Sequence, residues 1–561
     1  MSRRPPARRL RLVLGVLLLS LVGVGARVTV LHVRDAEEYV ALARDQRIRE
    51  VNLPATRGGI YDRNGHQLAI SLPAKAVYAN PRLIDRPRRA AKRLAPLLDE
   101  RVRTVAETLS RDTSFSYLAR RIDLESAEDI DALGIPGIGF LDESERHYPS
   151  DVLAPQVLGF VGIDNTGLAG IELQYEKLLA GRPGKMMVEQ DPTGRTIPQG
   201  LSRIREPARG KDLVLTIDRD LEFQAQRALR RAVRQNGAKG GTVVILDPSN
   251  GDVLAMVTYP WFDGNRFSEA KPETIRNRAV TDMYEPGSVN KVITAAAALE
   301  ERVIELDETF EVPDSYRVAN KRFRDVHRHP VQTMTIGDIM EESSNVGMIK
   351  VAERLGRDRL ARYLGRFGFG RPTGIDFPGE AEGIVLPRDQ WWVTSMGTIP
   401  IGQGIAVTPL QMASVYATIA NDGRAVRPRL VQGTRDEGSE PQLRPPRRGR
   451  RIVSKETAAR VREMLVRVVE EGTGKLAAVP GYRIGGKTGT ARKPLEGARG
   501  YSDEFVASFI GMAPADDARL VVAAILDEPD TVYGGIATAP LFREIVRAAL
   551  ADLHIPPSAG A

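Results

Sequence analysis

The sequence predicts an α+β fold with three parts: an N-terminal transmembrane helix, a mixed α/β region, and a larger domain in which a central antiparallel sheet packs against helices. Three observations predict it. A long apolar run occupies residues 12–33. Turn-rich sequence of mixed charge follows, to about residue 210. Beyond it, strand patterns stand at both ends of a segment whose middle is helical, which is typical of one sheet covered by helices.

The apolar run is long enough to cross a membrane. Arg27 is the only charge between Leu12 and Leu31, and an arginine near one end of a span can reach the interface. Because arginines at positions 3, 4, 8, 9 and 11 precede the run, we expect a cytoplasmic N-terminus and an external body. The alternative is a signal peptide cleaved after Ala26. We favour the anchor because the apolar character resumes after Arg27.

Composition excludes several classes of site. The chain has 561 residues, a net charge of +8 and no cysteine, which excludes disulfide scaffolds, cysteine-bound zinc and cysteine nucleophiles. Basic runs at residues 3–11 and 447–451 come without a nucleic-acid-binding motif, so no nucleic-acid partner is expected. His327 and His329 are an isolated candidate for a metal site, so no metal is expected.

We divide the chain into a basic cytoplasmic tail (1–11), an anchor (12–33), a first external domain (34–210), a second domain (211–553) and a tail (554–561). In the first domain, Asn64 and Gly65 are a turn signal that follows a short strand. The mixed charges Arg57, Asp62 and Arg63 are expected to pair with one another as a structural cluster.

The second domain contains clear periodic patterns. A helix with an apolar side is predicted at 219–234, and a hairpin is predicted at 241–257 with its turn at Asn250 and Gly251. The other predicted elements are strands at 212–218, 505–512 and 520–526 and a closing helix at 541–553.

The first chemical motif is Ser288 followed by Lys291. A serine hydroxyl needs a base, and residues three apart share one helix face. The alanine-rich sequence that follows predicts burial, which lowers the pKa of a lysine, and the positive end of the helix acts in the same direction. Ser268 and Lys271 repeat the pattern, but Pro272 disfavours a helix there. The structural alternative for Ser288 is an N-cap.

The second motif is Ser343 to Asn345, between helical patterns at 335–340 and 346–355. We expect Ser343 to pass a proton toward a leaving amine and Asn345 to orient a substrate amide. Helix capping is the alternative, since serine and asparagine favour helix starts. Ser288 and Asn290 also match this spacing, so the motif alone is weak.

The third motif is Lys487, Thr488, Gly489 and Thr490, which reads as a strand that a ligand approaches closely. Alternation places the two threonine hydroxyls on one face, where they can donate to a carboxylate beside the lysine. An extended peptide could add along this edge, and the backbone N–H groups of Ser288 and Thr490 could form an oxyanion hole. The alternative is an ordinary edge strand.

With these motifs in this order, the chain resembles the class B penicillin-binding proteins, and within them the division-specific (septal), penicillin-binding protein 3 type. The resemblance covers almost the whole chain. It extends to segments 284–291, 402–411, 486–493 and 533–542 in the second domain, and to non-catalytic pedestal motifs at 57–65 and 164–172 in the first.

The resemblance implies a peptidoglycan D,D-transpeptidase of the inner membrane, with its catalytic domain in the periplasm. The implied catalytic residues are Ser288, Lys291, Ser343 and Asn345, and Lys487 to Thr490 would bind substrate. It also implies a peptidoglycan stem pentapeptide as substrate, acylation of the serine by β-lactams, a SEDS-family glycosyltransferase and other division proteins as partners, and no cofactor.

Several alternatives stay open from the residues alone. They are an elongation-type class B transpeptidase, a penicillin-hydrolysing or sensor serine enzyme, and a catalytically silent scaffold of the division machinery. A Ser-His-Asp hydrolase is disfavoured because the chain has six histidines and no Gly-x-Ser-x-Gly around Ser288.

Overall fold

The computed structural model describes residues 7–33, 48–189, 203–447, 449–495, 497, 500–531 and 533–558. The predicted basic positions 3, 4 and 448 lie outside this range. The first compact unit comprises Met1–Thr56, Pro73–Ser144 and Gly181–Arg209, and the second comprises Arg57–Leu72, Glu145–Ala180 and Gly210–Ala561. The predicted α+β class is confirmed. The expected domain boundaries at 34, 211 and 554 stay a prediction.

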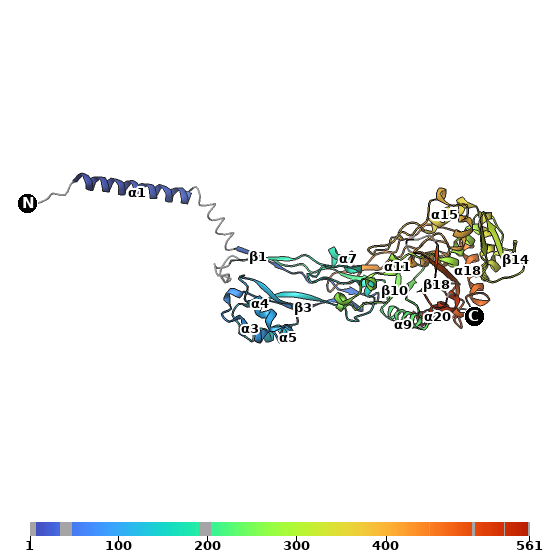
Figure 1. Ribbon diagram of the computed structural model, residues 1–561, viewed down its shortest axis with the longest axis horizontal. Coiled ribbons are helices and arrows are strands. Elements are labelled where there is room, and N and C mark those ends of the chain that lie inside the picture. Colours follow the sequence, from blue (N-terminus) through green and yellow to red (C-terminus); the bar gives the residue numbers. More distant parts are fainter. Residues whose placement is uncertain are drawn as a thin grey trace, which may run out of the picture. The chain divides into compact units, whose positions relative to one another are not determined.

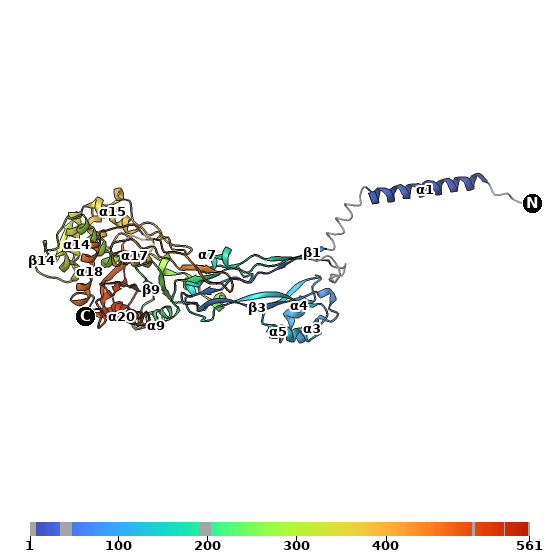
Figure 2. The same ribbon diagram turned by 180° about the vertical axis from the view of Figure 1, so that it is seen from behind.

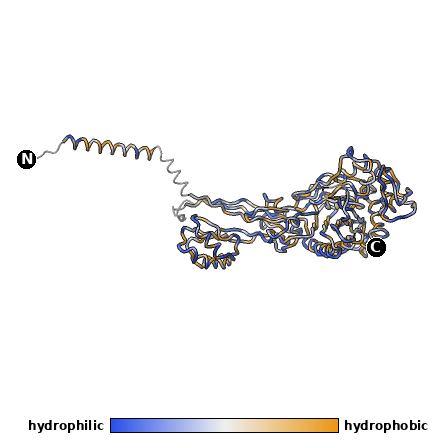
Figure 3. The backbone as a smooth tube through the Cα atoms, viewed as in Figure 1, coloured by the Kyte–Doolittle hydropathy of each residue, from blue (hydrophilic) through white to orange (hydrophobic). Residues whose placement is uncertain are grey.

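Helix α1 (Ala7–Val33) contains the predicted apolar run and begins inside the predicted tail. Its segment Leu10–Val33 has a mean hydropathy of 2.2, and its apolar window is not buried against the rest of the described chain. The hydrophobic colour follows almost the whole helix (Figure 3). At 1.5 Å per residue the 24-residue segment is about 36 Å long, enough to cross a hydrocarbon core of about 30 Å.

The rest of the first unit contains two sheet pieces and a small helical cluster. Strands β1 (Ile48–Leu53), β6 (Gly184–Glu189) and β7 (Arg203–Arg205) form an antiparallel sheet. Strand β3 (Gln67–Ala79), which has residues in both units, pairs with β4 (Ser116–Ile122) and β5 (Ile138–His147). The helices are η1 (Pro81–Leu83), α3 (Pro87–Leu94), α4 (Val102–Leu109) and α5 (Leu124–Asp131), around a core that includes Leu94, Leu109 and Ile130.

The second unit begins with β2 (Ile60–Tyr61), which turns into β3 and pairs in parallel with β8 (Asp212–Leu215). The predicted turn is confirmed, and Gly65 takes the left-handed conformation with φ of 87°. Strands β15 (Val431–Arg435) and β16 (Gln442–Leu443) extend the sheet beyond β8. Short helices α6 (Pro155–Leu158), α7 (Gly170–Gln174) and α8 (Glu176–Leu179) belong to the same unit.

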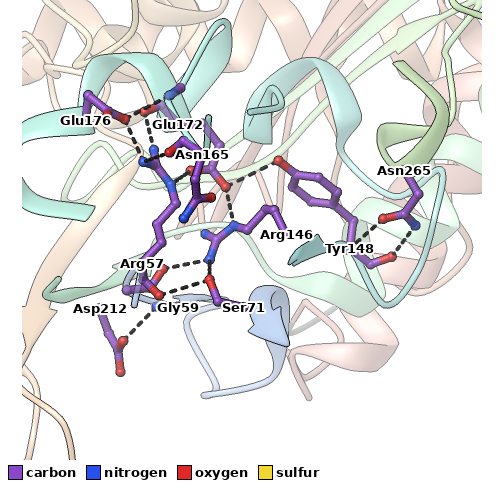
Figure 4. A network of polar contacts seen from close by, with 12 residues as sticks. Arg57, Gly59, Ser71, Arg146, Tyr148, Asn165, Glu172, Glu176, Asp212 and Asn265 are labelled. Atoms are coloured by element: carbon purple, nitrogen blue, oxygen red, sulfur yellow. Dashed lines mark hydrogen bonds and ion pairs between the residues drawn. The ribbon is translucent and has the colours of Figure 1, made fainter. Parts of the chain in front are cut away.

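A buried ion network joins the N-terminal segments of the second unit (Figure 4). The Arg57 side chain is fully buried, and its Nε donates to Glu172 Oε2 at 2.7 Å while Nη1 donates to Glu176 at 2.6 Å. Arg146 Nε donates to the other oxygen of Glu172 at 2.7 Å. Two guanidinium groups therefore share one buried carboxylate, which the hydroxyl of Tyr148 also contacts at 3.3 Å.

The expected pairing of Arg57, Asp62 and Arg63 with one another is wrong. Asp62 accepts hydrogen bonds from the N–H groups of Asn64 and His66, within its own turn, and contacts the His66 ring at 3.0 Å. An aspartate that caps its own turn has nearby donors already in place, while Arg57 finds its acids more than a hundred residues away.

The central sheet of the second unit has five antiparallel strands in the order β10-β9-β19-β18-β17. Val243 and Ile245 face one hydrophobic cluster and Val244 and Leu246 face another, so both sides of the sheet are covered. The predicted sheet, hairpin and flanking helices are confirmed, and β17 is an edge strand. The strands are β9 (Gly240–Leu246), β10 (Val253–Tyr259), β17 (Gly485–Pro494), β18 (Tyr501–Ala513) and β19 (Leu520–Asp527).

Helices α9 (Arg219–Gln235) and α20 (Ala539–Asp552) lie side by side on one face of this sheet (Figures 1 and 2). Helix α17 (Pro409–Ala420) packs against the other face. The main helical part beyond it contains α12 (Lys291–Glu300), α13 (Ile336–Glu341), α14 (Asn345–Leu355), α15 (Arg357–Phe367) and α18 (Lys455–Glu470).

Short elements complete the second unit. The hairpins are β11 (Thr309–Val312) with β14 (Gln332–Thr335) and β12 (Ser315–Val318) with β13 (Lys321–Arg324). The short helices are η2 (Gly264–Glu269), α10 (Pro272–Ile275), α11 (Arg278–Thr281), η3 (Gly287–Asn290), η4 (Arg388–Gln390), α16 (Ser395–Thr398), η5 (Ile399–Ile401), η6 (Lys475–Ala477) and α19 (Gly534–Ala537).

Candidate active site

Ser288 lies in a 3₁₀ turn, η3, and Lys291 begins helix α12 directly after it. The sequence predicts a helix here, and the structure differs only in its type. Three residues make one turn of a 3₁₀ helix, so the two side chains stand on the same side. Gly287 has φ of 60°, and a Cβ there would lie 2.9 Å from the carbonyl oxygen of Thr490. Glycine therefore allows the serine turn to abut the edge strand β17.

The competing pair, Ser268 and Lys271, has no such geometry. Lys271 is extended, with ψ of 138°, because Pro272 opens the next helix. Both side chains are exposed. The prediction that helix context separates the two Ser-x-x-Lys pairs is confirmed.

Lys291 is fully buried and reaches the second motif. Its Nζ donates to the Ser343 carbonyl at 2.6 Å, to Ser343 Oγ at 3.2 Å and to Asn345 Oδ1 at 2.9 Å. Burial lowers the pKa of Lys291 to about 7, although the charge of Asp325 acts in the opposite direction. Within the described residues, Lys291 forms no hydrogen bond with Ser288. Apo enzymes commonly tighten such a contact only when substrate binds.

The second motif lies between α13 and α14, as the sequence predicts. Capping is carried by Ser344, whose Oγ accepts from the Gly347 N–H at 2.9 Å. Ser343 is held in the left-handed region with φ of 57°, a conformation that non-glycine residues adopt rarely. Ser344 is therefore the residue that caps the helix. The side chains of Ser343 and Asn345 contact Lys291 instead.

Lys487 lies on edge strand β17 and is fully buried. Burial, and then the positive charge of Lys291, hold the pKa of Lys487 well below its ordinary value. The effect of Lys291 on Lys487 indicates that the two buried lysines lie near each other. Lys487 Nζ lies 3.4 Å from Thr488 Oγ1, which is also 3.0 Å from the hydroxyl of Thr473.

Gly489 and Thr490 bring the strand against the serine turn. A Cβ at Gly489 would lie 2.3 Å from Ser508 Oγ and 3.1 Å from the Pro286 carbonyl, so the close approach requires glycine. Thr490 Oγ1 accepts from the Gly534 N–H at 3.2 Å, which leaves its own proton available to an acceptor. The structure thus brings all three predicted motifs together.

Sequence reasoning missed three residues at this site: Thr473 and Gly534, which contact the threonines of β17, and Asp325, which contacts the second motif. Segment 533–542, which contains Gly534, was matched only by resemblance. Asp325 lies two residues before His327, and its sequence neighbours give no signal that it contacts the second motif.

Two family models match the chain. The penicillin-binding protein transpeptidase domain matches residues 241–547, and the penicillin-binding protein dimerisation domain matches residues 52–215. The first match alone covers more than half of the chain, so it shows the family.

Curated proteins match over nearly the full length. The chain is 36% identical to a probable peptidoglycan D,D-transpeptidase, PbpC, of Pseudomonas aeruginosa, over 99% of this chain and 97% of that protein. It is 34% identical to the peptidoglycan D,D-transpeptidase FtsI of Escherichia coli, over 98% of this chain and 93% of that protein. 

A crystal structure of penicillin-binding protein 3 from Mycobacterium tuberculosis with aztreonam matches with a TM-score of 0.72. It is 31% identical and covers 91% of this chain and 98% of its own. Together with the geometry of the three motifs, these matches establish that the chain belongs to the class B penicillin-binding proteins and is a serine-type peptidoglycan D,D-transpeptidase.

Proposed function

We propose that Ser288 is the acylated nucleophile of this transpeptidase and that Lys291 is its base. The observation that carries the proposal is the burial of Lys291, with its amine bonded to Ser343 and Asn345 and its pKa lowered to about 7. Near neutral pH, this lysine is unprotonated in about half of the molecules and can accept a proton there.

In the proposed first step, neutral Lys291 takes the proton of the Ser288 hydroxyl. The oxygen attacks the carbonyl carbon of the penultimate D-alanine of a stem pentapeptide. Backbone N–H groups of Ser288 and Thr490 stabilise the negative oxygen. When the amide bond breaks, a proton passes through Ser343 to the leaving nitrogen, and the terminal D-alanine departs. A neighbouring stem's amine then attacks the ester, forms the cross-link and returns a proton to Ser288.

We propose that the substrate lies along the free edge of β17. The hydroxyls of Thr488 and Thr490 would bind the terminal carboxylate, and Lys487 would supply charge nearby. Support comes from the edge position of the strand and from the Thr490 hydroxyl, whose proton is available to an acceptor. A β-lactam would enter the same position and acylate Ser288, as the complex of the similar Mycobacterium tuberculosis protein with aztreonam suggests.

We propose that cross-linking takes place at the division septum. The support is the resemblance of segments 402–411, 486–493 and 533–542 to the division subgroup. Depletion of the protein tests this role. Filamentous cells would support septal synthesis, and round cells would assign the protein to elongation.

We propose that α1 anchors the protein in the inner membrane, with its N-terminus in the cytoplasm and the catalytic domain in the periplasm. The 24-residue apolar segment and the arginines before it support this topology. A SEDS-family glycosyltransferase and other division proteins are the proposed partners, a role in which the anchor and the pedestal would take part. Cysteine scanning of residues 2–6 and 34–40 with a membrane-impermeant thiol reagent tests the topology, because the chain has no native cysteine.

The reaction itself is tested with a stem pentapeptide and a second peptide that carries a free amine. The proposal predicts release of D-alanine and formation of a cross-linked product, both lost in Ser288→Ala and retained in Ser268→Ala. Rapid hydrolysis of bound penicillin without cross-linking would support the penicillin-hydrolysing alternative. Absence of any adduct in the purified protein would support the silent scaffold.

A further inference from the structure

Asp325 accepts hydrogen bonds from three donors, two in the second motif and one in Val346 directly after it. It follows strand β13, and its side chain is 7% exposed. Its Oδ2 accepts from the Ser344 hydroxyl at 2.7 Å, and its Oδ1 accepts from the backbone N–H groups of Asn345 and, at 3.0 Å, Val346. A single carboxylate therefore binds the N-cap residue Ser344 and the first two residues of helix α14.

These contacts provide acceptors and a negative charge at the N-terminus of helix α14. The first N–H groups of a helix have no partner inside it, and a negative charge is favourable at that end. Ser344 satisfies only the N–H of Gly347. Asp325 takes the N–H groups of Asn345 and Val346, so the sharp turn that includes the left-handed Ser343 is fixed from outside the helix.

The backbone next to Asp325 also orients the amide of Asn345. Asn345 Nδ2 donates to the carbonyl of Arg324 at 3.0 Å, and its Oδ1 then accepts from Lys291 at 2.9 Å. The segment Arg324–Asp325 thus contacts the motif at its backbone, at the Ser344 hydroxyl and at the Asn345 amide.

We propose that Asp325, in contact with His329, is a positioning residue. It fixes Ser343 and Asn345 in the positions from which they bind the amine of Lys291. The inference rests on the roles proposed above for Lys291 and Ser343 and adds a residue that does not touch substrate.

His329 contacts the same carboxylate oxygen of Asp325 that Ser344 contacts. Its Nε2 lies 3.1 Å from Asp325 Oδ2, and its Nδ1 lies 2.7 Å from the carbonyl of Pro330. Both ring nitrogens face acceptors, and only the protonated imidazole donates from both. Burial lowers the pKa of His329, but the Pro330 carbonyl and Asp325, with Asp314 further off, outweigh it and raise the pKa.

The charge of Asp325 also affects the pKa of Lys291, so the pH profile of acylation distinguishes a positioning role from a purely structural one. This charge opposes the effect of burial on Lys291 and so raises the pKa of that lysine. Asp325→Asn keeps the size of the side chain and removes the charge. We expect acylation by a fluorescent penicillin to slow about tenfold to a hundredfold, and the midpoint of its pH profile to move to lower pH.

The control is Asp517→Asn, which removes one exposed carboxylate from the segment between β18 and β19 of the same unit. It should acylate at the wild-type rate. Ser344→Ala should also slow acylation, and the double variant Asp325→Asn with Ser344→Ala should be less impaired than the product of the two single effects, because both remove one contact.

Wild-type acylation rate and pH midpoint in folded Asp325→Asn would overturn the inference, and so would independent effects in the double variant. If Asp325→Asn does not fold, His329→Gln carries the test: slower acylation supports the role, and an unchanged rate overturns it. Mass spectrometry of the wild-type penicillin adduct distinguishes failure of the proposed function from failure of this inference. A missing adduct on Ser288 would refute the proposed function itself, while a normal adduct with no effect of Asp325 would refute only this inference.

Discussion

The lowered pKa of Lys291 predicts how acylation depends on pH. An ordinary lysine with a pKa of 10.5 would be neutral in only about one molecule in 3,000 at pH 7. With a pKa of about 7, half of the molecules carry the neutral base. Burial therefore increases the concentration of competent base about a thousandfold at neutral pH.

The assay is the rate of acylation by a fluorescent penicillin between pH 5 and 9, under conditions in which binding is not limiting. We expect a rise of about tenfold per pH unit below the midpoint, a midpoint near 7 and a plateau above it. Lys291→Arg stays protonated across this range and should lose at least about a thousandfold in rate. Lys493→Arg, a partly exposed lysine paired with Glu528, is the matched control and should keep the profile.

Two results would contradict the proposed role of Lys291 as the base. A rate that is constant from pH 5 to 9 would mean that deprotonation of Lys291 does not limit acylation. A Lys291→Arg variant that acylates within tenfold of wild type would mean that the proton of Ser288 goes elsewhere.

Three further predictions concern buried groups. Burial raises the pKa of Glu222 from 4.5 to about 7, so the contribution of Glu222 to the folding free energy is most favourable below pH 4.5 and weakens by about 3 kcal/mol between pH 4.5 and 7. In urea unfolding, Glu222→Gln should remove this loss, and parallel pH curves for variant and wild type would contradict it. Gly489→Ala should slow penicillin acylation at least tenfold, because its Cβ would meet Ser508 Oγ at 2.3 Å; a wild-type rate would show that the close approach is not needed. Arg57→Ala leaves the buried carboxylate of Glu172 with one fewer guanidinium and should cost about 3–5 kcal/mol of stability, measured by urea unfolding, whereas a loss under 1 kcal/mol would show that the network is replaceable.

The elements that could be predicted are those with a local signal. The alternation in β9, the apolar side of α9 and the Asn64–Gly65 turn each depend on neighbours in sequence, so a window of a few residues contains the information. The backbone difference between the two Ser-x-x-Lys pairs also has a local signal, the proline after Lys271.

What could not be predicted depends on contacts between distant segments. Arg57 and Glu172 are 115 residues apart, and nothing near Arg57 indicates which acid it pairs with. Asp325 approaches the second motif only because β13 and its loop pack beside α14. The bonding of Lys291 to Ser343 and Asn345, rather than to Ser288, is likewise a property of the packed domain.

The central claim is that Ser288 carries the acyl group. Peptide mapping by mass spectrometry of the purified protein, after reaction with penicillin, tests it most directly. We expect one intact penicillin per chain, on the peptide that contains Ser288. A label on Ser268, on another residue, or no label at all would contradict the proposed role of Ser288.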